Sequence, residues 1–306
     1  MRIVITGITG FLGRHLARQL CAAGHEVAGI ARKDPIPPLP DGVRFVRGDI
    51  ADAHVTAPLL AWAETLVHLA WSGTPGSSQG RPANEVAGNL MPTALLIEAL
   101  HAHPHCRVLF VSTGGALHAG DGRPAREDAS LNPRSYYGAA KGAVELLLHA
   151  LCRQAGHRAM AIRPSNVYGP GQPALPGFGV IPALMRSARE GLDFEVWGDG
   201  NTARDFLYIS DFSDAIERAL SAELPKGHLQ IVNAGSGVAV SLNTLHTLLT
   251  RISGRDIPRQ NHAARTVDPP QVLLDCSRAR QSLGWTPAVG IEEGLRLTWD
   301  WWKEQP

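Results

Sequence analysis

Cysteine is scarce in this chain of 306 residues, and the few thiols are dispersed. Cys21, Cys106, Cys152 and Cys276 lie far apart, and none forms a C-x-x-C pair, so neither a disulfide framework nor a thiolate metal site is indicated. Reduced, buried thiols in a cytoplasmic protein are the expected state. The histidine run at 101–105 has no neighbouring carboxylate or thiol set, which favours a solvated turn and predicts no metal.

The sequence also has no marked excess of positive or negative charge and no long apolar run. The net charge is +1 with no basic run, which argues against a nucleic-acid partner. No apolar stretch reaches the ~18 residues that a membrane span requires, and the N-terminus carries no charged and then apolar leader. Internal repeats and low-complexity segments do not stand out. The composition therefore predicts a globular, cytoplasmic protein that binds neither nucleic acid nor membrane.

The strongest signal lies at the start of the chain. Residues 3–5 are a short β-branched run typical of a buried strand. Gly7, Gly10 and Gly13 follow at once, and residues 11–23 have helical spacing. Strand, glycine turn and helix in this order form the mononucleotide-binding unit of a doubly wound sheet, because glycine lets the backbone turn tightly and a pyrophosphate approach the helix N-terminus. The stretch predicts a nucleotide site.

The end of the second expected strand, residues 26–30, bears on the choice of cofactor. A nicotinamide-binding fold usually places an acid there to hold the adenosine ribose hydroxyls. This chain has Ala31, Arg32, Lys33 and Asp34 instead. Two cations suit the 2′-phosphate of NADP, while a solvated basic loop and an Asp34 that turns in for NAD are the open alternatives. NAD or NADP is therefore predicted, with a slight preference for NADP.

Strands and helices continue to alternate as far as residue 163. The expected elements are strands 44–47, 65–70, 107–111 and 159–163 and helices 83–101 and 135–155. Asp49 could accept a hydrogen bond from an adenine amino group or cap a helix, and residues 71–80 form a Gly/Ser-rich loop that is a candidate flexible lid. The strand at 107–111 ends in Ser112 and Thr113, at the edge of the sheet where ligands bind.

Tyr137 and Lys141 are four residues apart on the expected helix and so share one face. A phenol of pKa ~10 is a poor base at neutral pH, but a lysine ammonium nearby favours the phenolate and lowers that pKa. The pair could then take a proton from a sugar or alcohol hydroxyl while hydride leaves the same carbon, with Ser112 or Thr113 holding the oxygen. Alone, this spacing is usually a solvated helix face; with the glycine turn it predicts a hydride-transfer site.

The regular alternation breaks at 164–179, a stretch dense in proline and glycine, and we place the domain transition there. The elements expected beyond it are helix 181–190, strand 194–197, strand 205–209, helix 211–222, strand 229–233, and helices 241–253, 277–283 and 291–301. Trp299, Trp301 and Trp302 are expected to pack the last helix on the body of the protein.

These motifs resemble those of an extended short-chain dehydrogenase/reductase, in particular the nucleotide-sugar epimerase/dehydratase branch typified by UDP-galactose 4-epimerase. The matching stretches are TGITGFLG at 6–13, GDI at 48–50, HLA at 68–70, Asn89, STGG at 112–115, YGAAK at 137–141, RPSNVYGPGQ at 163–172, WGDGNTARDFLYISD at 197–211 and LGWTP at 283–287. The resemblance implies an α/β fold, namely a Rossmann-type doubly wound parallel sheet with a smaller mixed α/β C-terminal substrate domain. It assigns 1–165 plus 206–235 to NAD(P) binding, and 166–205 and 236–306 to nucleotide-sugar binding.

The resemblance also implies the roles of site residues. Tyr137 is the base and acid, Lys141 orients the nicotinamide ribose, and Thr113, with Ser112 as second choice, is the catalytic hydroxyl. Cofactor contacts are implied at Gly7, Gly10, Phe11, Leu12, Gly13, Arg32, Lys33, Asp49, Ile50, Leu69, Ala70, Asn89, Ser112, Tyr137, Lys141 and Pro164. Substrate contacts are implied at Asn166, Arg204, Arg265 and Asp268. For Arg204 a pair with Asp205 or Asp211 is the alternative, and for Arg265 plain exposure.

The chain departs from the family pattern at three positions. Gly114 stands where epimerases commonly have the catalytic hydroxyl, which is why Thr113 is chosen. His118 stands where a tyrosine commonly follows that loop, so substrate contacts are expected to differ. Ala31 replaces the acid expected of an epimerase that retains NAD.

The leading function is a nucleotide-sugar 4-epimerase that acts through a transient 4-keto sugar, with a UDP-hexose or UDP-N-acetylhexosamine as substrate. An NADPH-dependent 4-ketoreductase of a nucleotide-linked 4-keto-6-deoxy sugar is the alternative that Arg32 and Lys33 favour. Dehydration is disfavoured, since STGG lacks the Asp-Glu pair of the family's dehydratases, and a non-catalytic NAD(P)-binding protein is the third possibility. Helices 83–101 and 135–155 form the family's usual dimer surface, so the resemblance implies a homodimer.

Overall fold

The structure is a computed structural model that describes residues 1–34, 38–118, 122–175, 179–264 and 269–305. Its larger part is built on a seven-stranded sheet of parallel neighbours, with the order β10-β6-β5-β4-β1-β2-β3. The strands are β1 (Arg2–Thr6), β2 (Glu26–Ala31), β3 (Arg44–Arg47), β4 (Thr65–His68), β5 (Arg107–Val111), β6 (Ala159–Pro164) and β10 (Leu229–Ala234). The chain winds outward from β1 in one direction and resumes on its other side at β4. Ligands bind at such a switch point, at the carboxyl ends of the strands.

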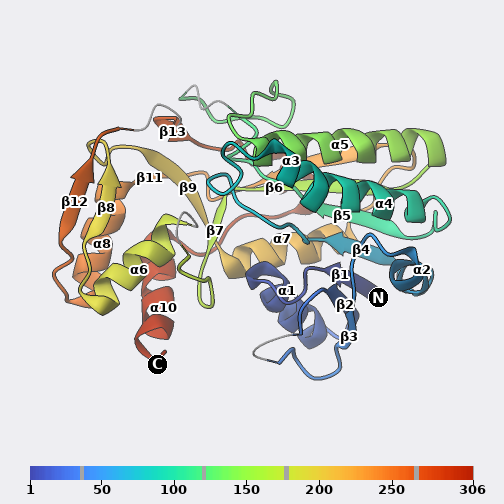
Figure 1. The fold of residues 1–306 in the computed structure, drawn as a ribbon, viewed down its shortest axis with the longest axis horizontal. Helices are drawn as coiled ribbons and strands as arrows, with labels where there is room; N and C mark the ends of the chain where they lie inside the picture. The colour runs from blue at the N-terminus through green and yellow to red at the C-terminus, as the bar shows by residue number, and fades with distance from the viewer. Residues whose placement is uncertain (35–37, 119–121, 176–178, 265–268, 306) are drawn as a thin grey trace.

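Helices cover both faces of this sheet (Figure 1). One face carries α1 (Phe11–Ala22) and α7 (Ile209–Ser221), and the other carries α2 (Ala53–Trp62), α4 (Met91–Leu100) and α5 (Tyr136–Ala155). Successive strand residues point to opposite faces, so Ile3 and Ile5 join the first core while Val4 joins the second. The apolar run predicted at 3–5 is therefore a central strand buried on both sides.

The segment predicted as one helix over 83–101 is interrupted. It consists of α3 (Pro82–Glu85), the π-helical turn η1 (Val86–Leu90) and α4. Pro92 explains the interruption, because it has no N–H to donate to Gly88 O one turn earlier. The amide of Met91 instead donates to Val86 O, five residues back, and Gly88 O accepts from Ser72 Oγ (3.3 Å).

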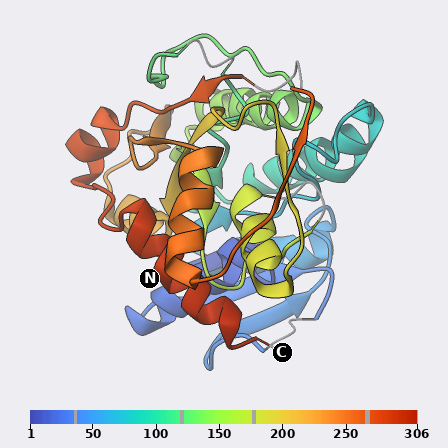
Figure 2. The same cartoon turned by 90° about the vertical axis from the view of Figure 1, so that its left-hand side faces the viewer.

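A smaller α/β part lies at the other end of the molecule (Figure 1; turned toward the viewer in Figure 2). Its sheets contain β7 (Asn166–Tyr168), β9 (Ala203–Tyr208), β11 (Ala239–Ser241) and β13 (Gln271–Val272), and separately β8 (Phe194–Trp197) with β12 (Arg259–His262). Its helices include α6 (Val180–Glu190), α8 (Leu242–Ser253) and α10 (Ile291–Lys303), whereas α9 (Ser277–Leu283) packs against β10 and α7 of the larger part. The predicted fold class, a Rossmann-type doubly wound sheet with a smaller mixed C-terminal part, is confirmed.

Some details differ from the sequence prediction. Residues 206–208, which we expected in the cofactor-binding part, belong to β9 of the smaller sheet, so we propose a boundary near residue 208. The sequence pattern did not indicate α2 or the short strands β7, β11, β12 and β13. Trp299 and Trp302 are buried in the core and Trp301 packs against it, as expected. Among the described residues, no helix combines the length and apolar character that crossing a membrane requires.

Candidate active site

The turn after β1 has glycine at positions where a side chain does not fit. Gly7 has a φ of +71°, and a Cβ there would lie 2.8 Å from Ala70 Cα. A Cβ on Gly13 would lie 2.5 Å from Gly7 O, so α1 packs directly on the turn. Helix α1 begins after Gly10 with no side-chain cap and no acid in its first turn, which leaves the amides of residues 11–13 open to an anion. The cradle therefore fits the pyrophosphate of a dinucleotide.

A buried chain of hydrogen bonds fixes the neighbouring end of β4. Thr6 Oγ1 accepts from the amides of Leu69 (3.1 Å) and Ala70 (3.0 Å) and donates to His68 Nδ1 (2.7 Å). His68 Nε2 in turn donates to Thr93 Oγ1 (3.1 Å). Burial lowers the pKa of His68 to about 3, so the ring is neutral and the network assigns its tautomer. Leu69 and Ala70, two predicted cofactor contacts, are thereby held beside the glycine turn.

The adenosine end of the predicted site lies beyond β2 and β3. Asp49 Oδ1 accepts from the amide of Ala51 (3.0 Å). The N-cap of α2 is Asp52, which accepts from the amide of His54 (2.9 Å). The helix-capping role that was the alternative for Asp49 therefore belongs to Asp52. Asp49 stays a predicted contact of the adenine, and Ile50 a predicted contact of the cofactor.

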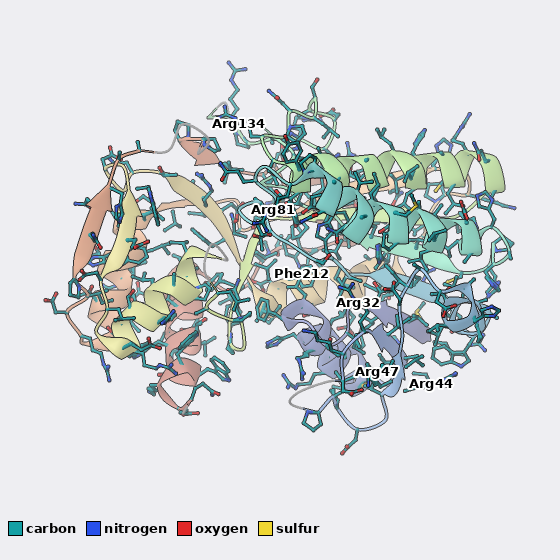
Figure 3. All side chains as sticks on the ribbon, viewed as in Figure 1. Arg32, Arg44, Arg47, Arg81, Arg134 and Phe212 are labelled. Carbon is teal, nitrogen blue, oxygen red and sulfur yellow. The ribbon has the colours of Figure 1, made fainter. Side chains whose placement is uncertain are left out.

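Cations gather at the same end. Arg32 and Lys33 are exposed after β2, and the strand register places Arg47 opposite Ala31 (Arg32 and Arg47 are labelled in Figure 3). Asp34, the acid that could have turned in for NAD, instead pairs with Arg47 (3.3 Å). Both partners are largely exposed, so this pair is weak, but the balance of charge at this end is positive.

Asn89 is buried and faces the loop of residues 71–80. Its Oδ1 accepts from the Ser72 amide (2.7 Å), and its Nδ2 donates to Ser72 O (2.8 Å) and to Glu85 Oε2 (2.9 Å). These bonds occupy the side-chain amide, and the cofactor contact that we predicted for Asn89 stays a prediction. Ser78 Oγ accepts from the Tyr137 amide (3.3 Å) near the loop's other end. The candidate lid is thus tied to the helices near both ends.

Tyr137 meets Thr113 because the start of α5 comes close to the loop that follows β5. Ser135 Oγ caps α5 by accepting from the Gly138 amide (3.1 Å). A Cβ on Gly138 would come within 2.2 Å of Ala116 O, so only glycine permits this approach. There the hydroxyl of Thr113 lies close enough to the phenol of Tyr137 to favour the phenolate and lower its pKa.

The two neighbours of Thr113 are unsuited to its role. Ser112 is buried, and its Oγ donates to Glu145 Oε1 (2.5 Å) rather than to the tyrosine. A Cβ on Gly114 would lie 2.3 Å from Leu274 Cδ1, so a side chain there would require Leu274 to move. The Gly114 amide donates to Pro164 O (2.8 Å), which holds the loop against the end of β6. The geometry therefore favours Thr113 as the hydroxyl beside the base.

Burial shifts the pKa values of Tyr137 and Lys141, the predicted catalytic pair, in opposite directions. It raises the pKa of Tyr137 to about 12, against the hydrogen bond with Thr113, which lowers it. It lowers the pKa of Lys141 to about 7, against the carboxylates of Glu145 and Glu85, which raise it. The lowered tyrosine pKa that we expected from Lys141 is therefore not found in the protein alone, since desolvation of the phenolate outweighs it. A positive charge bound beside the phenol would lower this pKa again.

A buried ion pair lies behind the predicted catalytic residues. Arg163 Nε and Nη2 donate to Glu145 Oε1 (3.0 Å) and Oε2 (2.7 Å), with side chains 2% and 4% exposed. Arg163 Nη1 also donates to Glu127 O (3.1 Å), and Glu127 Oε1 accepts from the Asn233 amide (3.0 Å). The network joins α5, β6 and β10, and nothing in the local sequence pattern indicated it.

The predicted substrate residues lie on the smaller sheet. Asn166 Nδ2 donates to Asp205 O (2.8 Å), and Arg204 Nη1 donates to Ala203 O (2.9 Å) and Pro269 O (2.8 Å). The carboxylates that were the alternative partners of Arg204 bind backbone amides: Asp205 accepts from Ser236 and Gly237, and Asp211 from Ala288 and Val289. His118 is buried. The predictions at Arg265 and Asp268 lie outside the described residues.

Comparison with known proteins relates the whole chain to sugar-nucleotide enzymes. A model of the NAD dependent epimerase/dehydratase family matches residues 3–235. The UDP-glucose 4-epimerase of Mycolicibacterium smegmatis is 32% identical over 314 aligned residues, which cover 100% of this chain and 99% of that protein. A dTDP-glucose 4,6-dehydratase of Mycobacterium tuberculosis and a dTDP-4-dehydro-6-deoxyglucose reductase of Escherichia coli also match, at 28% and 25% identity.

Solved structures share the fold over the full length. The UDP-glucose 4-epimerase of Thermotoga maritima, solved with UDP-glucose, superposes with a TM-score of 0.92 at 29% identity, covering 99% of each chain. The UDP-glucose 4-epimerase of Thermus thermophilus, in complex with NAD, has a TM-score of 0.90 at 28% identity, again covering 99% of each chain.

Proposed function

This chain belongs to the NAD dependent epimerase/dehydratase family, and on that basis we propose that it is a nucleotide-sugar 4-epimerase acting on a UDP-hexose or UDP-N-acetylhexosamine. The observation that carries the proposal is the closeness of the Tyr137 phenol and the Thr113 hydroxyl, at the carboxyl edge of the sheet that also presents the glycine turn. The relatives named as UDP-glucose 4-epimerases, at full-length coverage, support it.

In this mechanism the chain moves one proton at the sugar O4. Tyr137 takes the O4 proton while Thr113 holds the oxygen, and Lys141 orients the cofactor ribose. Gly7 and residues 11–13 would hold a nicotinamide cofactor, which would take the hydride from C4 and later return it to the other face, and whose oxidised ring would supply positive charge beside the phenolate. The 4-keto sugar turns over in the crevice, and Tyr137 then returns the proton to O4. Asn166 and Arg204 hold the diphosphate of the substrate throughout, Arg204 through its planar guanidinium.

One assay separates the candidate functions. The protein is incubated with UDP-glucose, UDP-N-acetylglucosamine and a 4-keto-6-deoxy sugar nucleotide, with and without added NAD(P)H, and both sugar and cofactor are followed. Epimer formation without net cofactor use supports the proposal. Stoichiometric loss of NADPH would replace it with a 4-ketoreductase, and lack of turnover would leave a non-catalytic NAD(P)-binding protein.

The 4-ketoreductase is kept as a second candidate because of the cations at the adenosine end. Arg32, Lys33 and Arg47 suit a 2′-phosphate, and Asp34 is paired with Arg47. We expect the Arg32→Ala variant to weaken NADPH binding about tenfold and to leave NADH binding unchanged, as measured by titration calorimetry.

Arg44→Ala is the matched control for that prediction. This substitution also removes one positive charge, but from the start of β3. Arg44 lies three strand residues before Arg47, so it is about 10 Å farther than Arg47 from the expected position of the phosphate. Tighter binding of NADH than NADPH to the unmodified protein would contradict the preference for NADP.

We also propose a homodimer formed through the helices of residues 83–101 and 135–155. Large apolar side chains are exposed on α4 and α5, which lie side by side (Figure 1): Met91 is 54% and Leu146 68% exposed. Such a patch marks a protein–protein surface. We expect Leu146→Glu to convert a dimer into a 32.8 kDa monomer in light scattering. Leu192 is also exposed but follows α6, away from these helices, so the control variant Leu192→Glu should stay dimeric. If the unmodified protein were a monomer, the proposal would be contradicted.

A further inference from the structure

The ammonium group of Lys141 is surrounded by aromatic rings from three elements. Its Nζ lies 4.0 Å from the ring centroid of Trp71, which follows β4, and 4.7 Å from that of Phe110 on β5. The ring of Tyr137 on α5 is 6.0 Å away. The only hydrogen bond of Nζ within the described part of the chain goes to Val111 O (2.7 Å). The side chain itself is 3% exposed.

The charged groups around Lys141 do not neutralise it. The carboxylate of Glu145, on the same helix, is bound by Arg163 and Ser112, and that of Glu85, on α3, accepts from Asn89. His68 on β4 is neutral. Neither carboxylate forms an ion pair with Lys141, and neither does any other in the described residues. A buried cation without a counter-ion is costly unless something else replaces its hydration.

The indole of Trp71 is placed to replace that hydration. The next residue, Ser72, is clamped by Asn89, which fixes where the side chain of Trp71 starts. Its Nε1 is buried and has no hydrogen-bond partner among the described residues, so no polar contact dictates the orientation of the ring. The ring instead lies over Lys141 Nζ and meets Tyr137 edge-on, with centroids 6.0 Å apart at an interplanar angle of 80°. Its negative π face thus points at the cation.

We propose that Trp71 is a positioning residue for Lys141: its indole face keeps the buried ammonium group charged and in place between β5 and Tyr137. The inference rests on the proposed function only in taking Lys141 as part of the active site. The charge is present below the pKa of the lysine and is lost as the pH rises through it. Removing the π face lowers that pKa, so at neutral pH less ammonium remains to favour the phenolate of Tyr137.

The test measures the titration of Lys141 directly. The chain contains four lysines, at positions 33, 141, 226 and 303, so labelling with [ε-¹³C]lysine gives four signals, and Lys141→Arg identifies the one in question. We expect Trp71→Leu to move the titration midpoint of Lys141 down by about one pH unit. Trp71→Phe keeps an aromatic face over the ammonium group, so it is expected to shift the titration midpoint much less than Trp71→Leu does. A parallel loss of turnover in Trp71→Leu, small near pH 6 and larger near pH 8, is expected for the epimerase assay.

Two results would overturn the inference. One is an unchanged midpoint in Trp71→Leu, and the other is an equal shift in Trp71→Leu and Trp71→Phe, which would assign the effect to lost bulk. Circular dichroism and thermal melting verify that each variant is folded. If Trp71→Leu does not fold, Trp71→Met replaces it, with the same expected shift of the midpoint. The titration needs no sugar substrate. A shifted midpoint without any epimer formation would therefore leave the inference standing and overturn the proposed function.

Discussion

Replacing Tyr137 with phenylalanine is expected to lower kcat by about 10²–10⁴-fold, the usual contribution of a general acid–base group. The phenol lies beside the hydroxyl of Thr113, where O4 is expected, and phenylalanine removes only its oxygen. The ring that meets Trp71 remains, so the dissociation constant of the cofactor should change less than twofold. Initial rates with a UDP-sugar and calorimetric titration with the cofactor measure the two quantities.

The neighbouring Tyr136 provides a matched control. It sits on the same turn of α5 but is 45% exposed, and Tyr136→Phe is expected to keep the unmodified rate. If Tyr137→Phe retained near-full turnover, or if the two variants lost activity equally, the assignment of Tyr137 as the base would have to be abandoned.

The Arg163→Met substitution is expected to reduce the free energy of unfolding by about 3–5 kcal/mol, because it leaves the carboxylate of Glu145 buried without its cation. The two side chains are 2% and 4% exposed, and two hydrogen bonds join them. Urea denaturation gives the change. The double variant Glu145→Leu/Arg163→Met removes both charges and should recover much of the loss, since apolar replacements of a whole buried pair are often tolerated.

The exposed pair Glu293–Arg296 on α10 is the control for this prediction. Its side chains are about half exposed, and Arg296→Met should leave the denaturation midpoint unchanged within error. A small effect of Arg163→Met, or a double variant less stable than the single one, would show that the buried pair does not act as a unit.

The local sequence pattern was sufficient to predict the strands of the central sheet. The bounds of β3 and β5 agree with the prediction to the residue, because a short apolar run between glycine, proline and charged residues has few other interpretations. The helix at 83–101 shows the limit of such a reading. The apolar periodicity of this segment led us to predict one continuous helix. Pro92 is a sequence signal for a break in that helix, and we did not weigh it. Strand β7, three residues in a proline-rich stretch, exists only because β9 pairs with it.

The candidate site likewise has features that local sequence predicts and features that it does not. The glycine turn and the spacing of Tyr137 and Lys141 are local features, and the structure places them at one edge of the sheet. The partners that set their chemistry come from far along the chain: Arg163 lies 18 residues from Glu145, and Thr6 lies 62 residues from His68. No spacing rule connects such residues. The raised pKa of Tyr137 likewise follows from burial, which charge spacing alone does not reveal.

Pro92, at the junction of η1 and α4, weakens the local helix but leaves a carbonyl free to bind the loop that carries Trp71. Because position 92 has no amide hydrogen, the carbonyl of Gly88 is left for the hydroxyl of Ser72, the residue next to Trp71. An alanine at position 92 would let the helix satisfy that carbonyl by itself. The segment would then become more regular and more stable while its hold on the loop weakened, a change that a search for thermostable variants would select at the expense of catalysis.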